Sequence, residues 1–321
     1  MSLPERLGRL ERVDRLGVGG FATVWLYHDA ELRSDVAVKA LADNWAQRLD
    51  VRERFLEEAR ILRQADSDHI VRVYDLGEVD GTPYFVMTYA DLGSLATLVN
   101  PGEPLPPARV AGLISQAGEG LTVLHDQGVV HRDIKPQNLL LRSGGTAGDR
   151  LLVADLGVAK AMLHASGLTQ VVGTPSYMAP EQATGIGVDA RADVHALAAV
   201  AYQMLTGRLV RTGSIGELAG ATLPPAPSHL VDLPTAVDDV LLRALQPSPD
   251  DRWNDVASFT AALRAAMPTP DVGPDRLTLW ETPGSAAPAV SERRPIWTLV
   301  LISLLVFAVA FVAAYVVTSL L

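Results

Sequence analysis

The pattern of hydrophobic and polar positions changes character near residue 90. Before that point, short runs rich in β-branched and aromatic residues alternate with glycine or charged turns, which predicts strands at 12–16, 23–27, 36–41, 70–76 and 84–89. One helix is predicted among them, over 47–64, because Phe55, Ala59 and Leu62 recur at helical spacing with charges elsewhere.

Beyond Leu95 the spacing is helical. It predicts helices at 108–127, 193–205, 236–245 and 256–266, with breaks at Gly207, Pro247 and Pro249. A small strand-rich lobe, about 10–90, followed by a larger helical lobe, about 91–267, is an α+β arrangement. We therefore predict one two-lobed domain over residues 1–267.

The last part of the chain has a different composition. Residues 268–295 contain six prolines and few large apolar side chains, which is typical of a linker. Residues 296–321 carry no charge, and a helix of about 20 apolar residues spans a bilayer, so we predict a transmembrane helix there. Arg293 and Arg294 precede this span and nothing basic follows it. We therefore expect a single-pass cell-membrane protein with its N-terminal side in the cytoplasm and no domain beyond the span.

Composition narrows the function classes. The net charge is −10 and no basic run occurs, which argues against nucleic acid as the main partner. With no cysteine, disulfides, thiolate zinc sites and catalytic thiols are excluded. Residues 1–16 have no apolar core segment, so no N-terminal signal is expected.

The most informative segment is the polar loop from His131 to Asn138, which lies between an apolar helix and the strand-like run 139–141. It places an acid (Asp133), a cation (Lys135) and an amide (Asn138) at fixed offsets. These groups can steer a hydroxyl onto a phosphoryl group beside a metal ion. A solvated turn would be the better interpretation of Asp133 alone, but it is a poor one for all eight residues in this order.

A glycine-rich turn, residues 17–24 (hereafter the glycine loop), is followed by a strand rather than a helix, so it is expected to join two strands of a hairpin. Its glycines would let backbone amides approach phosphates. Lys39 follows on the next strand, where its cation could meet phosphates and would need a carboxylate partner. Glu58 shares a helix face with Phe55, whereas Glu57 lies about 200° around that helix, so Glu58 is the predicted partner.

Asp155 follows a buried strand and precedes Gly157. A carboxylate there suits a Mg²⁺ ligand near phosphates, and the amide oxygen of Asn138 could serve a second metal position. The alternative for Asp155 is an aspartate that ends a strand in an ordinary turn.

Together these motifs resemble the eukaryotic-type (Hanks-type) serine/threonine protein kinases of bacteria, with a membrane anchor. The resemblance runs from Val13 to Ala266 and includes Ala179-Pro180-Glu181. It implies the two-lobed protein kinase fold, ATP with Mg²⁺ or Mn²⁺ as cofactors, and protein substrates with Ser or Thr acceptors.

The resemblance also implies roles for single residues. Asp133 would be the catalytic base, Lys135 would neutralise charge on the γ-phosphate, and Lys39, held by Glu58, would contact the α- and β-phosphates. Asn138 and Asp155 would hold the metal, and Glu181 and Arg252 would tie the substrate loop to the helical lobe. Residues implied in nucleotide binding are Gly17, Val18, Gly19, Gly20, Phe21, Ala22, Val24, Ala37, Lys39, Met87, Thr88, Tyr89 and Ala90. Four positions depart from the family pattern, namely Ala22, Thr88, Leu156 and Ala198, and none of them removes a charged catalytic group.

Regulation is implied as well. Arg132 would pair with a phosphate on the segment 158–174. The phosphate would be on Thr169, or also on Ser166. Autophosphorylation would place it there, and a homodimer is one way in which one copy could phosphorylate another. Thr174 is expected to contact Asp133 and Lys135. Two alternatives from other classes stay open, a pseudokinase scaffold and a membrane-tethering adaptor. Retention of all four residues expected to act on ATP and metal speaks against the first, namely Lys39, Asp133, Asn138 and Asp155.

Overall fold

The computed structural model describes residues 3–144, 148–157, 176–184, 187–212 and 222–268 of the 321-residue chain. The chain divides into units at 1–270 and 271–321, and the elements named below belong to the first. The predictions for Ser166, Thr169 and Thr174, for the linker beyond Pro268 and for the span 296–321 lie outside the described residues. None of the helices in the described ranges combines the length and apolar character that a membrane crossing needs.

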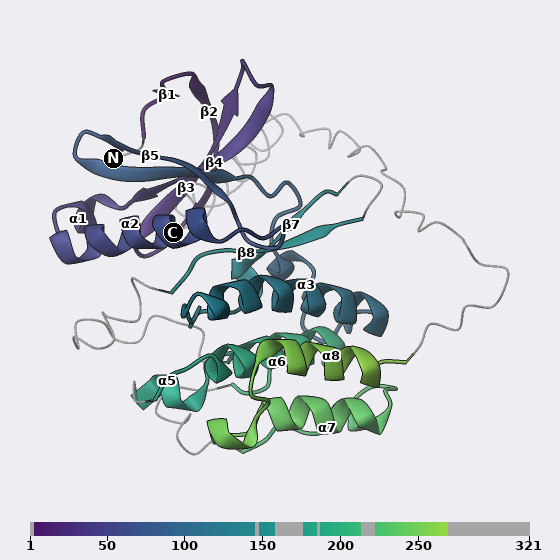
Figure 1. The fold of residues 1–321 in the computed structure, drawn as a ribbon. Coiled ribbons are helices and arrows are strands. Elements are labelled where there is room, and N and C mark those ends of the chain that lie inside the picture. Colours follow the sequence, from purple (N-terminus) through teal and green to yellow (C-terminus); the bar gives the residue numbers. More distant parts are fainter. Residues whose placement is uncertain (1–2, 145–147, 158–175, 185–186, 213–221, 269–321) are drawn as a thin grey trace, which may run out of the picture. The chain divides into compact units, whose positions relative to one another are not determined.

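The small lobe is built on an antiparallel sheet of six strands in the order β1-β2-β3-β4-β6-β5 (Figure 1). The strands are β1 Arg6–Leu7, β2 Leu10–Val18, β3 Ala22–Asp29, β4 Ser34–Leu41, β5 Val73–Val79 and β6 Thr82–Thr88. The glycine loop comprises the end of β2, the turn 19–21 and the start of β3, so it joins two strands of a hairpin, as predicted. Lys39 in β4 pairs with Val24 on one side and with Phe85 on the other, so it lies in the middle of the sheet next to that turn.

Two helices follow β4, where the sequence predicts one. α1 Asp43–Ala46 and α2 Leu49–Gln64 are separated because Arg48 is extended, with φ −91° and ψ 109°. The prediction of a single helix from residue 47 is therefore wrong at its start. The face of α2 that is buried contains Phe55, Glu58 and Leu62, which is the face predicted from the apolar spacing.

The predicted strand 70–76 is wrong at its start as well. β5 begins only at Val73, and the preceding residues pair with the other lobe. The amide of Val71 donates to Val153 O at 2.9 Å, and the amide of Val153 donates to His69 O at 2.8 Å. One apolar run is thus divided between two sheets, because β8 offers an unpaired edge at this point.

The large lobe is helical and follows the prediction closely (Figure 1). Its helices are α3 Pro107–Asp126, α5 Pro180–Thr184, α6 Arg191–Thr206, α7 Thr235–Ala244 and α8 Val256–Ala266, and its strands are β7 Leu139–Arg142 and β8 Arg150–Val153. Short 3₁₀ turns are η1 Leu95–Thr97, η2 Pro136–Asn138, η5 Pro227–His229 and η6 Pro249–Asp251. α6 is the central helix, buried along almost its whole length, and ends at Gly207 with φ +67°. The predicted two-lobed α+β fold is confirmed.

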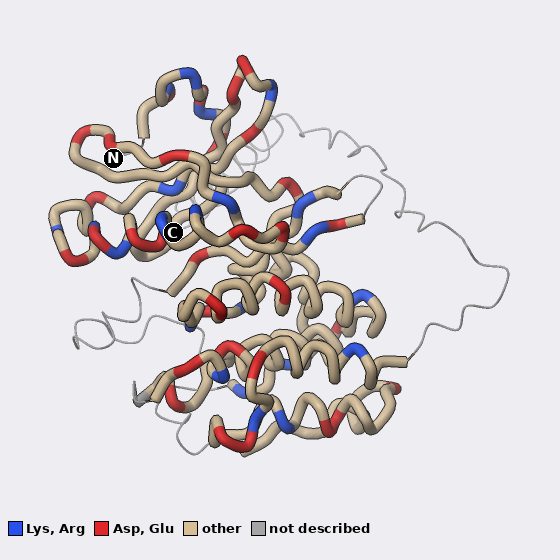
Figure 2. The backbone as a smooth tube through the Cα atoms, viewed as in Figure 1, with Lys and Arg blue, Asp and Glu red and all other residues tan. Residues whose placement is uncertain are grey.

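Two apolar clusters hold the domain together. The larger one runs from the inner face of the sheet and α2 into the helices of the large lobe. The smaller one lies on the outer face of the sheet, where Leu3 of the segment before β2 packs in the same cluster as Tyr27. Tyr27 Oη donates to Pro4 O at 2.6 Å, so this N-terminal segment is fixed to the sheet. In the described part, charges of both signs are interspersed along strands and helices (Figure 2).

Candidate active site

The 131–138 loop is held in place by a buried aspartate of α6. The Asp193 carboxylate accepts from the His131 amide at Oδ2 and from the Arg132 amide at Oδ1, both at 2.8 Å. The same carboxylate lies 2.8 Å from His125 Nε2 at the end of α3. Asp193 therefore joins two helices to the loop. Sequence reasoning treated it only as a helix start, since its partners lie more than sixty positions away.

His131 connects this loop to the strand before Asp155. Its ring is fully buried, and Nε2 lies 3.0 Å from Ala154 O while the Asp133 amide donates to Nδ1 at 3.3 Å. Burial lowers the pKa of His131 and outweighs the opposing effect of Asp193 and Asp133. A neutral ring satisfies both contacts when Nε2 carries the proton and Nδ1 accepts. His131 is thus a positioning residue for Asp133.

The acid, the cation and the amide predicted from their spacing converge on one carboxylate. Lys135 Nζ lies 3.2 and 3.1 Å from the two oxygens of Asp133. Asn138 Nδ2 donates at 2.8 Å both to Asp133 Oδ2 and to its backbone carbonyl. These three residues therefore form one hydrogen-bonded group centred on the Asp133 carboxylate.

Lys39 bridges two carboxylates from different lobes. Its Nζ lies 2.7 Å from Glu58 Oε1 and 2.9 Å from Asp155 Oδ1. Burial alone would lower the pKa of Lys39, but Asp155 and Glu58 outweigh it and leave the pKa raised, so the lysine is a cation. The choice of Glu58 over Glu57 is confirmed, since Glu57 instead forms an exposed pair with Arg60.

Backbone geometry is unusual at two points of the site. Arg132 has φ +64° and Asp155 has φ +57°, a region that residues other than glycine seldom adopt. Gly157 is required by a close approach, because a Cβ there would lie 2.9 Å from His131 O and 3.2 Å from Asp133 Cβ. Its amide donates to His131 O at 3.0 Å. The turn after Asp155 is therefore packed directly onto the 131–138 loop.

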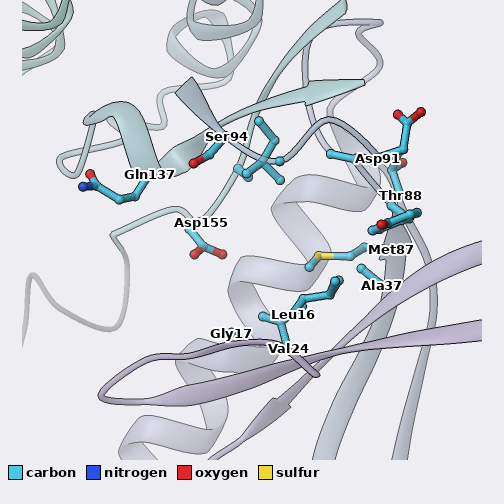
Figure 3. Close-up of a pocket in the computed structure, with 15 residues that line it drawn as sticks. Leu16, Gly17, Val24, Ala37, Met87, Thr88, Asp91, Ser94, Gln137 and Asp155 are labelled. Atoms are coloured by element: carbon cyan, nitrogen blue, oxygen red, sulfur yellow. The ribbon is translucent and has the colours of Figure 1, made fainter. Parts of the chain in front are cut away.

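A cavity of about 450 Å³ lies between the lobes of this domain, lined by apolar residues of both (Figure 3). From the small lobe come Leu16, Val24 and Ala37, and from β6 comes Met87; Leu140 of β7 faces them. A second, more polar compartment of about 630 Å³ shares Gly17 and Asp155 with it. All thirteen residues predicted for nucleotide binding line one or both compartments. Lining residues that sequence reasoning missed are Leu16, Asp91, Gly93, Ser94, Gln137, Leu140 and Ala154.

The connection between the lobes is held by hydrogen bonds of two residues that also line the cavity, Thr88 and Asp91. The Thr88 hydroxyl accepts from the Arg72 amide at 3.2 Å and lies 3.1 Å from Tyr74 Oη on β5. The Asp91 carboxylate accepts from the amide and hydroxyl of Ser143 at 2.8 and 2.5 Å. The Thr88 amide in turn donates to Arg72 O at 2.9 Å, so Thr88 is tied to the start of β5 by both its backbone and its side chain.

The polar compartment can hold a divalent cation. Asp155 offers carboxylate oxygen, and because the Asn138 amide nitrogen is used on Asp133, its oxygen is the atom suited to a metal. No group of three or more His, Cys, Asp or Glu side chains suited to a metal occurs in the described residues. Two protein oxygens fit Mg²⁺, which takes its other ligands from water and phosphate.

The predicted pair Glu181–Arg252 is present. The carboxylate accepts twice from the guanidinium, both at 2.7 Å, and Arg252 is buried with its other donors on Gln246, Pro247 and Arg191 carbonyls. Gln182, which sequence reasoning missed, donates to Arg132 O at 2.8 Å and accepts from the Ala179 amide. α5 is thereby fixed both to the large lobe and to the 131–138 loop. Arg132 itself is exposed.

The site combines a lysine cation held between two carboxylates, a glycine loop that lines the same compartment, and an acid–lysine–asparagine group. On a two-lobed scaffold, these features define a nucleotide-dependent phosphoryl-transfer site. The chain belongs to the protein kinase family, because the protein kinase domain matches residues 10–253.

Relatives agree with this assignment. The serine/threonine-protein kinase Pkn1 of Myxococcus xanthus is 38% identical over 271 residues, which cover 82% of this chain and 39% of that protein. PknB of Mycobacterium leprae is 34% identical over 293 residues, covering 87% of this chain and 46% of that protein. The crystal structure of the PknI kinase domain of Mycobacterium tuberculosis covers 83% of this chain with 28% identity and a TM-score of 0.65. The chain spans less than half the length of the two curated relatives, Pkn1 and PknB.

Proposed function

We propose that this protein is a serine/threonine protein kinase that transfers the γ-phosphoryl group of ATP to Ser or Thr hydroxyls of proteins. The observation that carries the proposal is the convergence of Lys135 and Asn138 on the Asp133 carboxylate, at 3.1 to 3.2 Å and at 2.8 Å, in the domain that also holds the Lys39–Glu58 pair. The names of the relatives Pkn1 and PknB support serine and threonine as acceptors.

Binding of the nucleotide follows from the two compartments. The apolar one, with Val24, Ala37, Met87 and Leu140, suits the adenine ring, and backbone groups of 88–90, which also line it, would supply hydrogen bonds at its edge. The polar one brings glycine-loop amides and Lys39 to the phosphates. Mg²⁺ held by Asn138 and Asp155 would bridge phosphate oxygens and neutralise charge that develops during transfer.

Transfer requires an oriented acceptor and a stabilised phosphoryl group. The Asp133 carboxylate would accept or orient the proton of the acceptor hydroxyl, while Lys135, already beside it, would stabilise charge on the γ-phosphoryl group. The Lys39 cation is already held by Glu58 and Asp155 in the compartment that the glycine loop also lines, where it would meet a phosphate. A pseudokinase scaffold is disfavoured because all these charged groups are present, with Lys39 paired to Glu58 and Asp155 and with Lys135 paired to Asp133.

The proposal is tested by incubating the purified full chain with radiolabelled ATP, Mg²⁺ and a generic basic protein. We expect label on serine or threonine in wild type and its loss in Asp133→Asn, which keeps the side-chain size but removes the carboxylate. If neither protein incorporates label while wild type still binds ADP, the result would instead support the scaffold alternative. Label confined to tyrosine would contradict the acceptor class.

Location and regulation are part of the proposal. We infer that residues 296–321 anchor the protein in the cell membrane with the kinase domain in the cytoplasm, supported by the charge-free run and by Arg293 and Arg294 before it. Autophosphorylation of Thr169 or Ser166, with Arg132 as the receiving cation and a homodimer as one route, would regulate activity. Full activity of Thr169→Ala, with no phosphopeptide from segment 158–174, would exclude this mode of regulation.

A further inference from the structure

The tip of the glycine loop is attached to α1 by contacts that phosphate binding does not require. Trp45 Nε1 donates to Gly20 O at 2.8 Å, and the Ala42 amide donates to Phe21 O at 2.8 Å. The rings of Phe21 and Trp45 are tilted against each other with centroids 5.0 Å apart. Two successive carbonyls and one ring of the tip are thus held by the segment 42–45.

Trp45 is in turn connected to α2, the helix that positions Lys39. The Arg48 guanidinium lies 5.7 Å from the Trp45 ring and is paired with Asp50 at 2.8 Å. The carbonyl of Arg48 accepts from the Arg52 amide in the first turn of α2 at 2.9 Å. Glu58 lies further along the same helix. A continuous set of contacts therefore runs from the loop tip to the lysine that Glu58 holds.

These contacts restrain the glycine loop. Gly17, Gly19 and Gly20 give the loop many conformations, and ordering them opposes ligand binding. A tryptophan that already bonds the tip reduces this loss before the nucleotide arrives. We propose that Trp45 is a positioning residue that fixes the glycine loop beside the phosphate compartment and couples it to α2, an inference that rests on the nucleotide-dependent function proposed above.

The variant Trp45→Phe tests the hydrogen bond in the full chain, because it keeps an aromatic ring for Phe21 and removes the Nε1 donor. Trp25→Phe is the matched control: Trp25 is also in the small lobe, but its ring lies 5.0 Å from the Arg12 guanidinium and packs in the outer-face cluster. We expect KM for ATP and Kd for ADP to rise about threefold to tenfold in Trp45→Phe. kcat should change less than KM, and Trp25→Phe should match wild type in both.

Tryptophan emission gives a second readout. Titration with Mg²⁺ and ADP should change the emission of wild type and of Trp25→Phe, and this change should be absent in Trp45→Phe. If Trp45 only packs α1 onto the lobe, Trp45→Phe would lower the unfolding temperature while leaving KM for ATP and Kd for ADP at the wild-type values. That outcome would overturn the inference.

The inference and the proposed function fail in distinguishable ways. The ADP titration needs no phosphoryl transfer, so a wild type that binds ADP and labels no protein defeats only the proposed function. If wild type labels protein and Trp45→Phe has the same KM for ATP and Kd for ADP as Trp25→Phe, only the role of Trp45 is contradicted. A wild type that binds no ADP defeats both.

Discussion

At the scale of single residues, the site depends on cations and carboxylates that hold one another. Lys39 is 8% exposed, and a lysine so buried would lose its charge unless paired. Glu58 and Asp155, one from each lobe, keep it protonated. A buried ion pair of this kind contributes little to stability by itself, but removal of one partner leaves an uncompensated charge at the site.

The first prediction concerns this pair. Glu58→Gln should lower kcat/KM about ten- to hundredfold, the value of one charge-assisted hydrogen bond that orients Lys39. Glu57→Gln is the matched control, because Glu57 is exposed and pairs with Arg60, and it should stay within about twofold of wild type. Steady-state kinetics of both variants decides the matter. Equal losses in the two would mean that Glu58 does not position Lys39.

The second prediction concerns His131 and pH. Burial lowers the pKa of His131 from 6.5 in the native state. Below pH 6.5 the unfolded chain therefore takes up a proton on this ring that the native state does not yet bind. The free energy of unfolding should therefore fall as pH drops below 6.5. Glutamine has a donor and an acceptor but does not titrate. In His131→Gln the free energy of unfolding, measured by denaturant titration, should therefore fall less between about pH 7.5 and 5.5 than it does in wild type. Parallel curves for the two proteins would contradict the lowered pKa.

The residues that the sequence predicted share one property, namely that their partners follow from local spacing or periodicity. Lys135 and Asn138 reach Asp133 within one short loop, and helical phase distinguishes Glu58 from Glu57. Asp193 and Gln182 were missed because the loop residues that they hold, His131 and Arg132, lie 50 or more positions away and no pattern points to them. The roles assigned by resemblance, including the nucleotide and metal contacts, stay predictions until activity is measured.

At the scale of elements, apolar periodicity predicted the type and order of the helices and strands well, and it predicted their first and last residues less well. α8 has the predicted bounds, and α3 and α7 differ by one residue at each end. The errors arise where tertiary contacts decide. The extended Arg48 divides a helical run, and pairing of residues 69–71 with Val153 takes the start of a strand into another sheet.

The third prediction tests how α3 packs. A Cβ at Gly120 would lie 2.5 Å from His69 O, on the segment that pairs with β8, so Gly120→Ala must displace backbone and should destabilise the domain by about 1–3 kcal/mol. Gly112 lies on the exposed side of the same helix, where an added Cβ would meet nothing within 4 Å. Gly112→Ala should therefore stabilise by about 0.5–1 kcal/mol. Urea unfolding of both variants measures the difference, and equal effects would contradict the close approach.

At the scale of the whole molecule, the kinase domain is joined to a segment whose chemistry differs from everything before it. The domain carries charges of both signs over its described part (Figure 2), whereas residues 296–321 carry none. Proline-rich residues between them suit a spacer that does not pack into a core. Such a division would let a kinase act on proteins near a bilayer while folding independently of it.

The fourth prediction tests that division in cells. A charge-free run of this length lowers the free energy of the chain in hydrocarbon, so the full chain should sediment with membranes and resist carbonate extraction. Deletion of 296–321 should move it to the supernatant with its kinase activity retained. Deletion of 271–290 is the matched control, because it shortens the chain and keeps Arg293, Arg294 and the span, and it should leave the protein in the membrane. Release of the full chain by carbonate, or retention after loss of 296–321, would show that this segment is not the anchor.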